Sequence, residues 1–393
     1  MRMQKTGSRE RDEAPRPGTG ERMQTPRYTA VVGPLPSTVP FVGPEAQERG
    51  RGRAFRARIG ANESVFGPSP RAVAAMARAA AECWRYGDPE NHDLKAALAR
   101  VHGIRPENVV VGEGIDALLG YTVRLVVEPG TPVVSSLGAY PTFNFHVAGH
   151  GGRLVTVPYE RDRENPAALL EAAARERAPL LFFCNPDNPM GSWWPAAEVQ
   201  HLIAGVPGGT LLCVDEAYGE FAPDGTLPPL DVSDPRVLRF RTFSKAYGMA
   251  GARIAYAVGE ASVVKSFDKI RNHFGVNAIA QAGALASLDD PAHLAAVVAK
   301  VAAARERIGA IARAGGLEPL PSGTNFVALD CGRDGAFARR VLAELGARDV
   351  FVRMPGVAPL DRCIRVTAGT DADLAVFAAA LPEALAAARA AVG

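Results

Sequence analysis

Seven short apolar runs recur between about residue 108 and residue 259, and they constrain the fold more than any other feature of the sequence. The runs cover residues 108–112, 131–136, 153–159, 179–184, 210–216, 237–243 and 253–259. Several are apolar at successive positions instead of alternating ones, which is typical of strands covered by helices on both faces. Amphipathic stretches such as NPAALLEAAARERA separate most of the runs. The pattern predicts an α/β fold with a mostly parallel sheet of about seven strands.

The pattern changes from about residue 289, where a segment opens with Asp-Asp-Pro and ends on paired glycines. Aspartate and proline favour a helix start and glycine a helix end, so residues 289–316 predict one long capped helix. Short strand-like runs (TNFVALD, DVFVRM and CIRVTAG) and an alanine-rich segment follow it. We therefore expect an N-terminal tail and arm over 1–58, a large domain over 59–288 and a smaller α+β domain over 289–393.

The N-terminal segment is rich in Arg, Glu, Gly and Pro and carries almost no large apolar side chains. Such a segment cannot bury enough apolar surface to offset its ordering entropy, so we expect roughly the first 26 residues to be disordered. It also lacks the apolar core of a signal peptide, and no stretch of about 18 mostly apolar residues occurs in the chain. We expect a protein that is neither secreted nor membrane-spanning.

Charge and cysteine content narrow the classes of function. The 44 basic and 42 acidic residues give a net charge of +2, and no basic stripe with interleaved aromatic residues occurs, so no nucleic-acid partner is expected. The five cysteines are far apart, without a C-x-x-C pair, which indicates reduced thiols in a cytoplasmic protein. The seven histidines show no metal-ligand spacing, so no metal is expected.

Polar, turn-rich blocks stand at the ends of several apolar runs. In chain order these blocks read GEGIDALLG, NPDNPMG, DEAY and FSKAYGMAGAR. Ligands of open parallel sheets bind at the carboxyl ends of the strands, so we expect a site built from these blocks. In this order they resemble the fold type I pyridoxal-5′-phosphate enzymes, specifically the class I/II aminotransferases close to histidinol-phosphate aminotransferase. The resemblance runs from about Ile59 to about Leu381, and it implies the large and small domains of that fold.

Lys245 is the residue to which the resemblance assigns the cofactor. Taken alone, a lysine at a strand end is usually a surface residue. Pyridoxal-phosphate chemistry requires a lysine that bonds covalently to the cofactor and is then released to move a proton, with the phosphate anchored nearby. The hydroxyl of Ser244 and the planar guanidinium of Arg253 suit phosphate oxygens, and the family uses these positions in that way.

The resemblance also assigns the groups around the cofactor ring. Asp215 would keep the ring nitrogen protonated, so that the ring can accept electrons, whereas alone it could be a helix N-cap. Tyr218 and Asn188 would hydrogen-bond the phenolic oxygen, which favours its ionised form. Asn188 lies in NPDNPMG, which alone is also compatible with a plain double turn.

The block GEGIDALLG follows a predicted strand and opens a predicted helix. Glycines at a helix N-terminus let backbone N–H groups face an anion, so Gly114 and the amides of Ile115 and Asp116 are candidate phosphate ligands. The family usually has Ser or Ala where this chain has Ile115, which removes any hydroxyl contact from that position.

Three upstream residues are assigned by the same resemblance. Tyr140 aligns with the aromatic residue that stacks on the cofactor ring, although a core tyrosine is the alternative. Tyr86 matches the residue that reaches the phosphate of the neighbouring subunit, which implies a homodimer. Asn62 lines the substrate side in relatives, and an ordinary helix-entry turn is its alternative.

Two arginines near the end of the chain complete the expected site. In the family, the arginine of the block IRVTAGT, here Arg365, holds the substrate carboxylate, because a guanidinium pairs with it bidentately. Arg353 matches a position that contacts the distal group of the substrate in histidinol-phosphate enzymes. Arginines in apolar strands otherwise snorkel to the surface or form salt bridges.

Together these residues predict an aminotransferase that uses pyridoxal 5′-phosphate, with Lys245, Asp215 and Tyr140 as its catalytic residues. The partners implied are a small amino donor and a 2-oxo acid acceptor. The same residues are compatible with decarboxylation, as in threonine-phosphate decarboxylases, or with an amino-acid oxidase or cyclase reaction. A cofactor-sensing regulatory domain is the non-enzyme alternative, but residues 1–59 lack a helix-turn-helix pattern.

Overall fold

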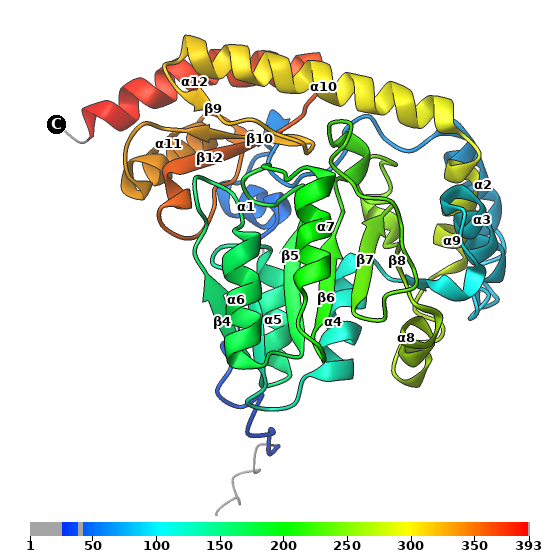
Figure 1. Ribbon diagram of the computed structural model, residues 1–393. Coiled ribbons are helices and arrows are strands. Elements are labelled where there is room, and N and C mark those ends of the chain that lie inside the picture. The colour runs from blue at the N-terminus through cyan, green and yellow to red at the C-terminus, as the bar shows by residue number, and fades with distance from the viewer. Residues whose placement is uncertain (1–25, 38–41, 392–393) are drawn as a thin grey trace, which may run out of the picture.

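The computed structural model describes residues 26–37 and 42–391. Its large sheet has seven strands in the order β2-β8-β7-β6-β5-β3-β4 (Figure 1). They are β2 (Val109–Gly112), β3 (Pro132–Ser136), β4 (Arg153–Val157), β5 (Leu180–Cys184), β6 (Leu211–Asp215), β7 (Val237–Thr242) and β8 (Ala255–Gly259). The pairings are parallel except those of β8, which is antiparallel to β2 and β7. The predicted α/β fold with a mostly parallel seven-stranded sheet is confirmed.

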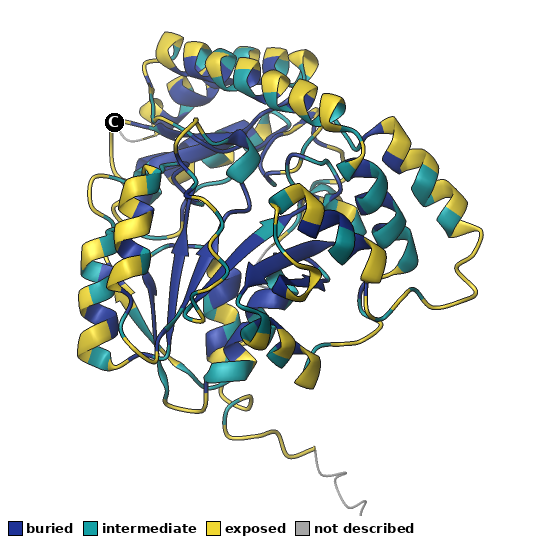
Figure 2. Cartoon of the chain, turned by 45° about the vertical axis from the view of Figure 1, so that its right-hand side comes forward, coloured by how far each residue is buried: buried dark blue, intermediate teal, exposed yellow. Residues whose placement is uncertain are grey.

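Helices cover both faces of this sheet (Figure 1). The covering helices are α4 (Ile115–Val126), α5 (Pro141–Gly149), α6 (Pro166–Glu176) and α7 (Ala196–Gly205). Leu180 and Phe182 of β5 belong to the core that contains α4 and α5, whereas Leu181 and Phe183 belong to the core that contains α6 and α7. Each such side chain contributes roughly 1.5–3 kcal/mol through burial. This two-sided burial explains why the run is apolar at successive positions, and Figure 2 shows the strands as buried and the outer helix faces as exposed.

The remaining elements lie around this core. At one edge of the sheet, α9 packs against both α2 and α3 (Figure 1). The helices not yet given are α1 (Pro44–Arg51), α2 (Pro70–Ala80), α3 (His92–His102), α8 (Ala261–Ser266), α9 (Ala278–Leu288), α10 (Pro291–Ala314), α11 (Gly335–Ala347) and α12 (Asp371–Ala390). Short 3₁₀ turns are η1 (Pro106–Asn108), η2 (Gly219–Phe221), η3 (Ala250–Ala252), η4 (Phe267–Lys269) and η5 (Leu360–Arg362).

The C-terminal part forms a second layer above the carboxyl ends of the large sheet (Figure 1). Its antiparallel sheet has the order β12-β10-β9, with β9 (Glu318–Pro319), β10 (Phe326–Asp330) and β12 (Cys363–Thr367). Helix α10 begins after Asp290, whose side chain accepts from the His293 N–H, and Gly315 follows its last residue, which confirms the predicted long capped helix. The helices α10, α11 and α12 cover this layer.

One strand pairing joins the N-terminal arm to this C-terminal layer. β1 (Ala57–Arg58) pairs in parallel with β11 (Val350–Phe351), a contact that no local pattern indicated. The predicted disordered tail falls mainly on residues 1–25, which lie outside the described residues. Within the described ranges, no helix has both the length and the apolar character to cross a membrane.

Candidate active site

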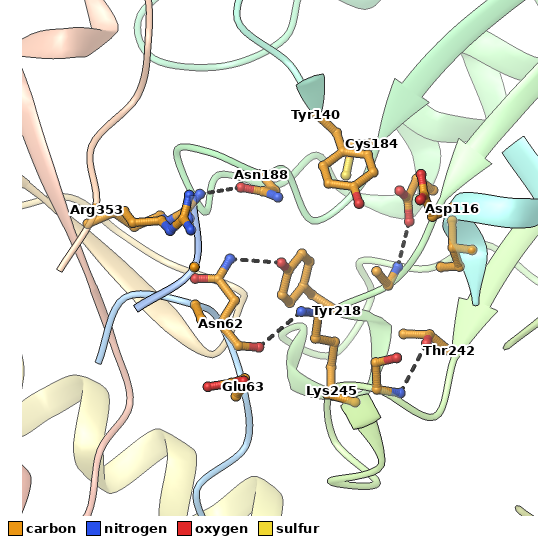
Figure 3. A pocket seen from close by; sticks show the side chains of 18 of the residues that line it. Asn62, Glu63, Asp116, Tyr140, Cys184, Asn188, Tyr218, Thr242, Lys245 and Arg353 are labelled. Carbon is orange, nitrogen blue, oxygen red and sulfur yellow. Dashed lines mark hydrogen bonds between the residues drawn. The ribbon is translucent and has the colours of Figure 1, made fainter. Parts of the chain in front are cut away.

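A cavity of about 390 Å³ lies where β5, β6 and β7 end, between the large sheet and the C-terminal layer. Figure 3 shows its lining side chains pointing toward one another from both parts of the chain. Most of the predicted site residues line it: Asn62, Ile115, Asp116, Tyr140, Asn188, Asp215, Tyr218, Ser244, Lys245, Arg253, Arg353 and Arg365. Gly114 and Tyr86 are the predicted residues outside this lining.

Lys245 extends into the cavity from the turn that follows β7 (Figure 3). Its Nζ donates a hydrogen bond to the backbone oxygen of Asn62 at 3.0 Å. Burial lowers the pKa of Lys245 to about 8, and the nearby charges of Arg365 and Arg253 act in the same direction. An amine with this pKa is partly unprotonated near neutral pH, as a nucleophile or a base requires.

Asp215 is the last residue of β6, and its carboxylate accepts a hydrogen bond from the Ala217 N–H at 3.0 Å. Burial raises the pKa of Asp215 to about 7, although the charge of Lys245 opposes the rise. A buried carboxyl group is costly without a partner of opposite charge. Asp215 is therefore suited to pair with a cationic group that enters the cavity.

Two hydrogen bonds across the cavity join distant parts of the chain. Arg365 of β12 donates from Nη1 to Oδ1 of Asn188 at 2.5 Å. Asn62 donates from Nδ2 to the hydroxyl oxygen of Tyr218 at 2.9 Å (Figure 3). Burial lowers the pKa of Arg365 to about 10. The Nε of Arg365 is buried and has no hydrogen-bond partner within the described part of the chain, so one donor of its planar fork remains available to an anion.

Gly114, at the N-terminus of α4, lies against the guanidinium of Arg253. Gly114 precedes this helix with φ of 95°, and a Cβ there would lie only 2.3 Å from Nη2 of Arg253. The absence of that Cβ leaves room for the guanidinium, whose Nη2 donates to the backbone oxygen of Glu113 at 3.4 Å. A helix N-terminus and a guanidinium side by side favour a negative charge between them. The Ser244 hydroxyl lines the same cavity. An amine, a buried carboxyl group and this anion site match the donor set that pyridoxal 5′-phosphate requires.

Tyr140 immediately precedes α5 and is partly buried in the cavity wall. Burial raises the pKa of its hydroxyl to about 12, and the charge of Asp116 adds to the rise. The phenol therefore stays neutral at physiological pH. The Oδ1 atom of Asp116 lies 3.0 Å from Nε2 of His146.

Tyr86 lies away from the cavity and is 81% exposed. Its ring packs against that of Phe274, with centroids 4.6 Å apart. The residue was predicted to contact the cofactor of a neighbouring subunit, and that role stays a prediction. Arg353 reaches the cavity and also donates from Nη2 to the backbone oxygen of Val42 at 2.8 Å.

Several residues of the wall were not predicted from the sequence. Gly43, Pro44 and Glu45 of the N-terminal arm line the cavity, as do Cys184 and Thr242. Cys184 and Thr242 end β5 and β7, so the rule that ligands gather at strand ends could have found them. The arm carries no comparable pattern. Within the described ranges, no cluster of three or more His, Cys, Asp or Glu residues could hold a metal ion.

The mixed seven-stranded sheet, with a lysine just beyond one strand and a carboxyl group at the end of the neighbouring strand, is that of the fold type I class of transferases. Residues 58–381 match the family model of class I and II aminotransferases. The chain therefore belongs to the class I and II aminotransferase family, and it is a transaminase.

Individual relatives agree with this assignment. Histidinol-phosphate aminotransferase 1 of Mesorhizobium japonicum is 36% identical over 336 residues, which cover 84% of this chain and 90% of the relative. The aromatic amino acid aminotransferase of Rhodococcus jostii is 35% identical over 357 residues, covering 90% of this chain and 95% of the relative.

A solved structure is more similar still. Histidinol-phosphate aminotransferase from Sinorhizobium meliloti, in complex with pyridoxal-5′-phosphate, is 55% identical and superposes with a TM-score of 0.90. The match covers 93% of this chain and 99% of that protein. Aspartate aminotransferase from Thermus thermophilus shares only the fold, at 22% identity and a TM-score of 0.74 over 87% of this chain and 94% of that protein.

Proposed function

We propose that this pyridoxal-phosphate-dependent transaminase takes its amino group from histidinol phosphate and passes it to a 2-oxo acid. The observation that carries the proposal is the arrangement of Lys245, Asp215 and Arg365 around one cavity, which provides an amine, a ring-nitrogen partner and an anion clamp. The two relatives from Mesorhizobium japonicum and Sinorhizobium meliloti, both histidinol-phosphate aminotransferases, support this donor.

Several residues would hold the cofactor. Arg253, Ser244 and the first amides of α4, those of Ile115 and Asp116 after Gly114, would bind its phosphate. Asp215 would pair with the protonated ring nitrogen, and Asn188 and Tyr218 would hydrogen-bond the phenolic oxygen. Tyr140 would pack on the ring face. When bound, the cofactor supplies an electron sink for the negative charge that develops at the substrate Cα.

Lys245 performs two tasks in this proposal. Its amine first holds the cofactor covalently and is then displaced by the amine of the substrate. The freed Nζ would act as general base on the proton at the substrate Cα and then as general acid, returning that proton at the carbon of the cofactor aldehyde. The lowered pKa of Lys245, at about 8, suits both tasks near neutral pH.

The arginines bind the anionic groups of the two substrates. The 2-oxo acid carries a carboxylate and histidinol phosphate carries a phosphate ester, and the guanidinium fork of Arg365 pairs with either. Arg353, from the same wall, would contact the more distal group, and Asn62 would line the substrate side. The walls also limit access of water, which strengthens these charge pairs.

We further propose a homodimer in the cytoplasm. The exposed Tyr86 and Phe274 support a partner surface, because large apolar side chains are usually covered in the working assembly. The five cysteines are all free, which suits a reducing compartment.

The test is an amino-donor panel with purified enzyme loaded with cofactor. Histidinol phosphate, aromatic amino acids and histidine are each offered with 2-oxoglutarate, while glutamate, carbon dioxide and hydrogen peroxide are measured. We expect glutamate with histidinol phosphate at a kcat/KM at least about tenfold above that of any other donor. Preference for an aromatic amino acid would correct the donor, and carbon dioxide or peroxide without glutamate would contradict transamination.

A further inference from the structure

Two acidic side chains, Glu164 and Asp187, lie together beside the turn that carries Asn188 and are only 1% and 2% exposed. Their carboxyl groups are hydrogen-bonded to each other. Two ionised carboxylates in contact in a buried place repel strongly, so the pair holds one proton. No role for either residue follows from the chemistry of the site described above.

Asp187 closes the turn that presents Asn188. Its Oδ1 accepts from the Tyr159 hydroxyl at 2.8 Å and its Oδ2 accepts from the Met190 N–H at 3.0 Å. Its backbone N–H donates to the oxygen of Ser192 at 2.8 Å. Both oxygens of the Asp187 carboxyl group are therefore held by donors of the surrounding segments.

Glu164 joins this turn to two strand ends. Its carboxyl group accepts from the Ser136 hydroxyl at 2.9 Å and from the Cys184 N–H at 3.2 Å, and it donates its proton to Asp187. Ser136 ends β3, the strand that leads to Tyr140. Cys184 ends β5, the strand that leads to the turn containing Asn188. Glu164 therefore connects the segments that carry two walls of the cavity.

The surrounding groups keep the proton on Glu164. Burial raises the pKa of Glu164 well above its ordinary range, and the negative charge of Asp187 adds to the rise. Burial also raises the pKa of Asp187, to about 6, while Tyr159 and Arg365 oppose that rise. Burial raises the pKa values of Tyr159 and Cys184 as well, so both groups stay neutral.

We propose that the Glu164–Asp187 carboxyl pair is a positioning element that fixes Tyr140 and Asn188 at their places on the cofactor cavity, and that it requires the proton of Glu164 to do so. Loss of that proton would place two negative charges in contact and push the two segments apart. The consequence for the cofactor rests on the proposed function, whereas the consequence for the fold does not.

The first experiment uses protein without cofactor and measures thermal unfolding from about pH 5 to about pH 9 for the parent and Glu164→Gln. A group whose pKa is raised by folding stabilises fully below its unfolded pKa and loses that contribution as pH rises toward its folded pKa. Glutamine keeps the donor to Asp187 at every pH. We expect Glu164→Gln to gain melting temperature over the parent progressively as pH rises, and Glu171→Gln, an exposed change on α6, to follow the parent.

The second experiment measures the Kd for pyridoxal 5′-phosphate by titration at neutral pH. We expect Glu164→Ala to weaken binding at least about tenfold and Glu164→Gln to recover it to within about threefold of the parent. A constant difference in melting temperature across the pH range would overturn the proposal even if Glu164→Ala does not fold. Equal Kd values for the parent and Glu164→Ala would also overturn it.

Discussion

The guanidinium of Arg365 donates to the side-chain oxygen of Asn188 at 2.5 Å, across 177 residues of sequence. Arg365 lies in the middle of β12 and Asn188 follows β5 of the large sheet, so this contact joins the two layers at the cavity. Asn188 therefore fixes the guanidinium in the empty cavity, and under the proposed function a substrate anion would meet a fork that is already oriented.

Replacement of Arg365 by Lys tests the clamp. Lysine keeps a positive charge but loses the planar pair of donors, so we expect the KM for the 2-oxo acid to rise at least about tenfold, a loss of about 1.4 kcal/mol or more. Steady-state kinetics with varied acceptor measure this change. Arg313→Lys, an exposed change on α10, is the control and should leave the KM unaltered. An unchanged KM in Arg365→Lys would assign the clamp to another residue.

Replacement of Lys245 by Ala tests the covalent attachment. The variant cannot bond to the aldehyde of the cofactor, so we expect the yellow absorbance of the bound cofactor to vanish while phosphate-anchored cofactor is retained. Mass spectrometry after borohydride reduction locates the modified lysine in the parent. Lys269 is exposed, and the control variant Lys269→Ala should retain both the absorbance and the modified lysine. Persistence of the modification in Lys245→Ala would show that another lysine holds the cofactor.

Replacement of Asp215 by Asn tests the buried carboxyl group through stability. Burial raises the pKa of Asp215 from 3.8 to about 7. Its contribution to the free energy of unfolding is therefore complete below about pH 4 and is lost as the pH rises to about 7. Without cofactor, we expect the free energy of unfolding of Asp215→Asn to rise relative to that of the parent across that window, by a few kcal/mol in order of magnitude.

Denaturant unfolding of the cofactor-free proteins at several pH values measures this difference. Asp224 is exposed, and the free energy of unfolding of the control variant Asp224→Asn should equal that of the parent at every pH. Parallel stability curves for Asp215→Asn and the parent would mean that the carboxyl group is already paired in the empty cavity.

Much of the site follows from local sequence. Residues 180–184 are apolar at successive positions because both faces of β5 are covered, and that pattern is visible without a structure. Asp215 and Lys245 were found because they stand at or just beyond strand ends. Their roles, however, came from the resemblance to a family, since a single carboxylate or lysine in such a place is compatible with several uses.

Other parts depend on contacts between distant segments. No local signal indicates that β8 runs antiparallel, because direction is set by the connections around a strand and not by its composition. The arm residues Pro44 and Glu45 line the cavity, and the same arm pairs its strand β1 with β11. Glu164 lies in a loop-like stretch, and only the folded chain brings its carboxyl group to Asp187.

Replacement of Gly114 by Ala tests the anion site at α4. The added Cβ would lie 2.3 Å from Nη2 of Arg253 and would displace the guanidinium. We expect the Kd for pyridoxal 5′-phosphate to rise at least about tenfold. Gly130→Ala is a matched control, because Gly130 also has a positive φ, of 86°, but has open space where a Cβ would stand. Equal effects of the two changes would attribute the loss to backbone strain alone.

A mixture of two inactive proteins tests whether Tyr86 serves the site of a partner subunit. Lys245→Ala and Tyr86→Ala are each expected to lose activity, and they are then co-expressed in equal amounts. If each site takes Lys245 from one subunit and Tyr86 from the other, half of the dimers are mixed and each mixed dimer has one intact site. Activity should therefore return to about one quarter of the parent value.

The matched control for this mixture pairs Lys245→Ala with Asp215→Ala, two changes within one subunit's cavity. Every site of that mixture carries one of the two changes, so its activity should stay at the level of the separate variants. Recovery only with Tyr86→Ala would place the exposed tyrosine, 81% accessible in the single chain, at the cofactor of its partner. Absence of recovery in both mixtures would mean that each cavity is complete within one chain.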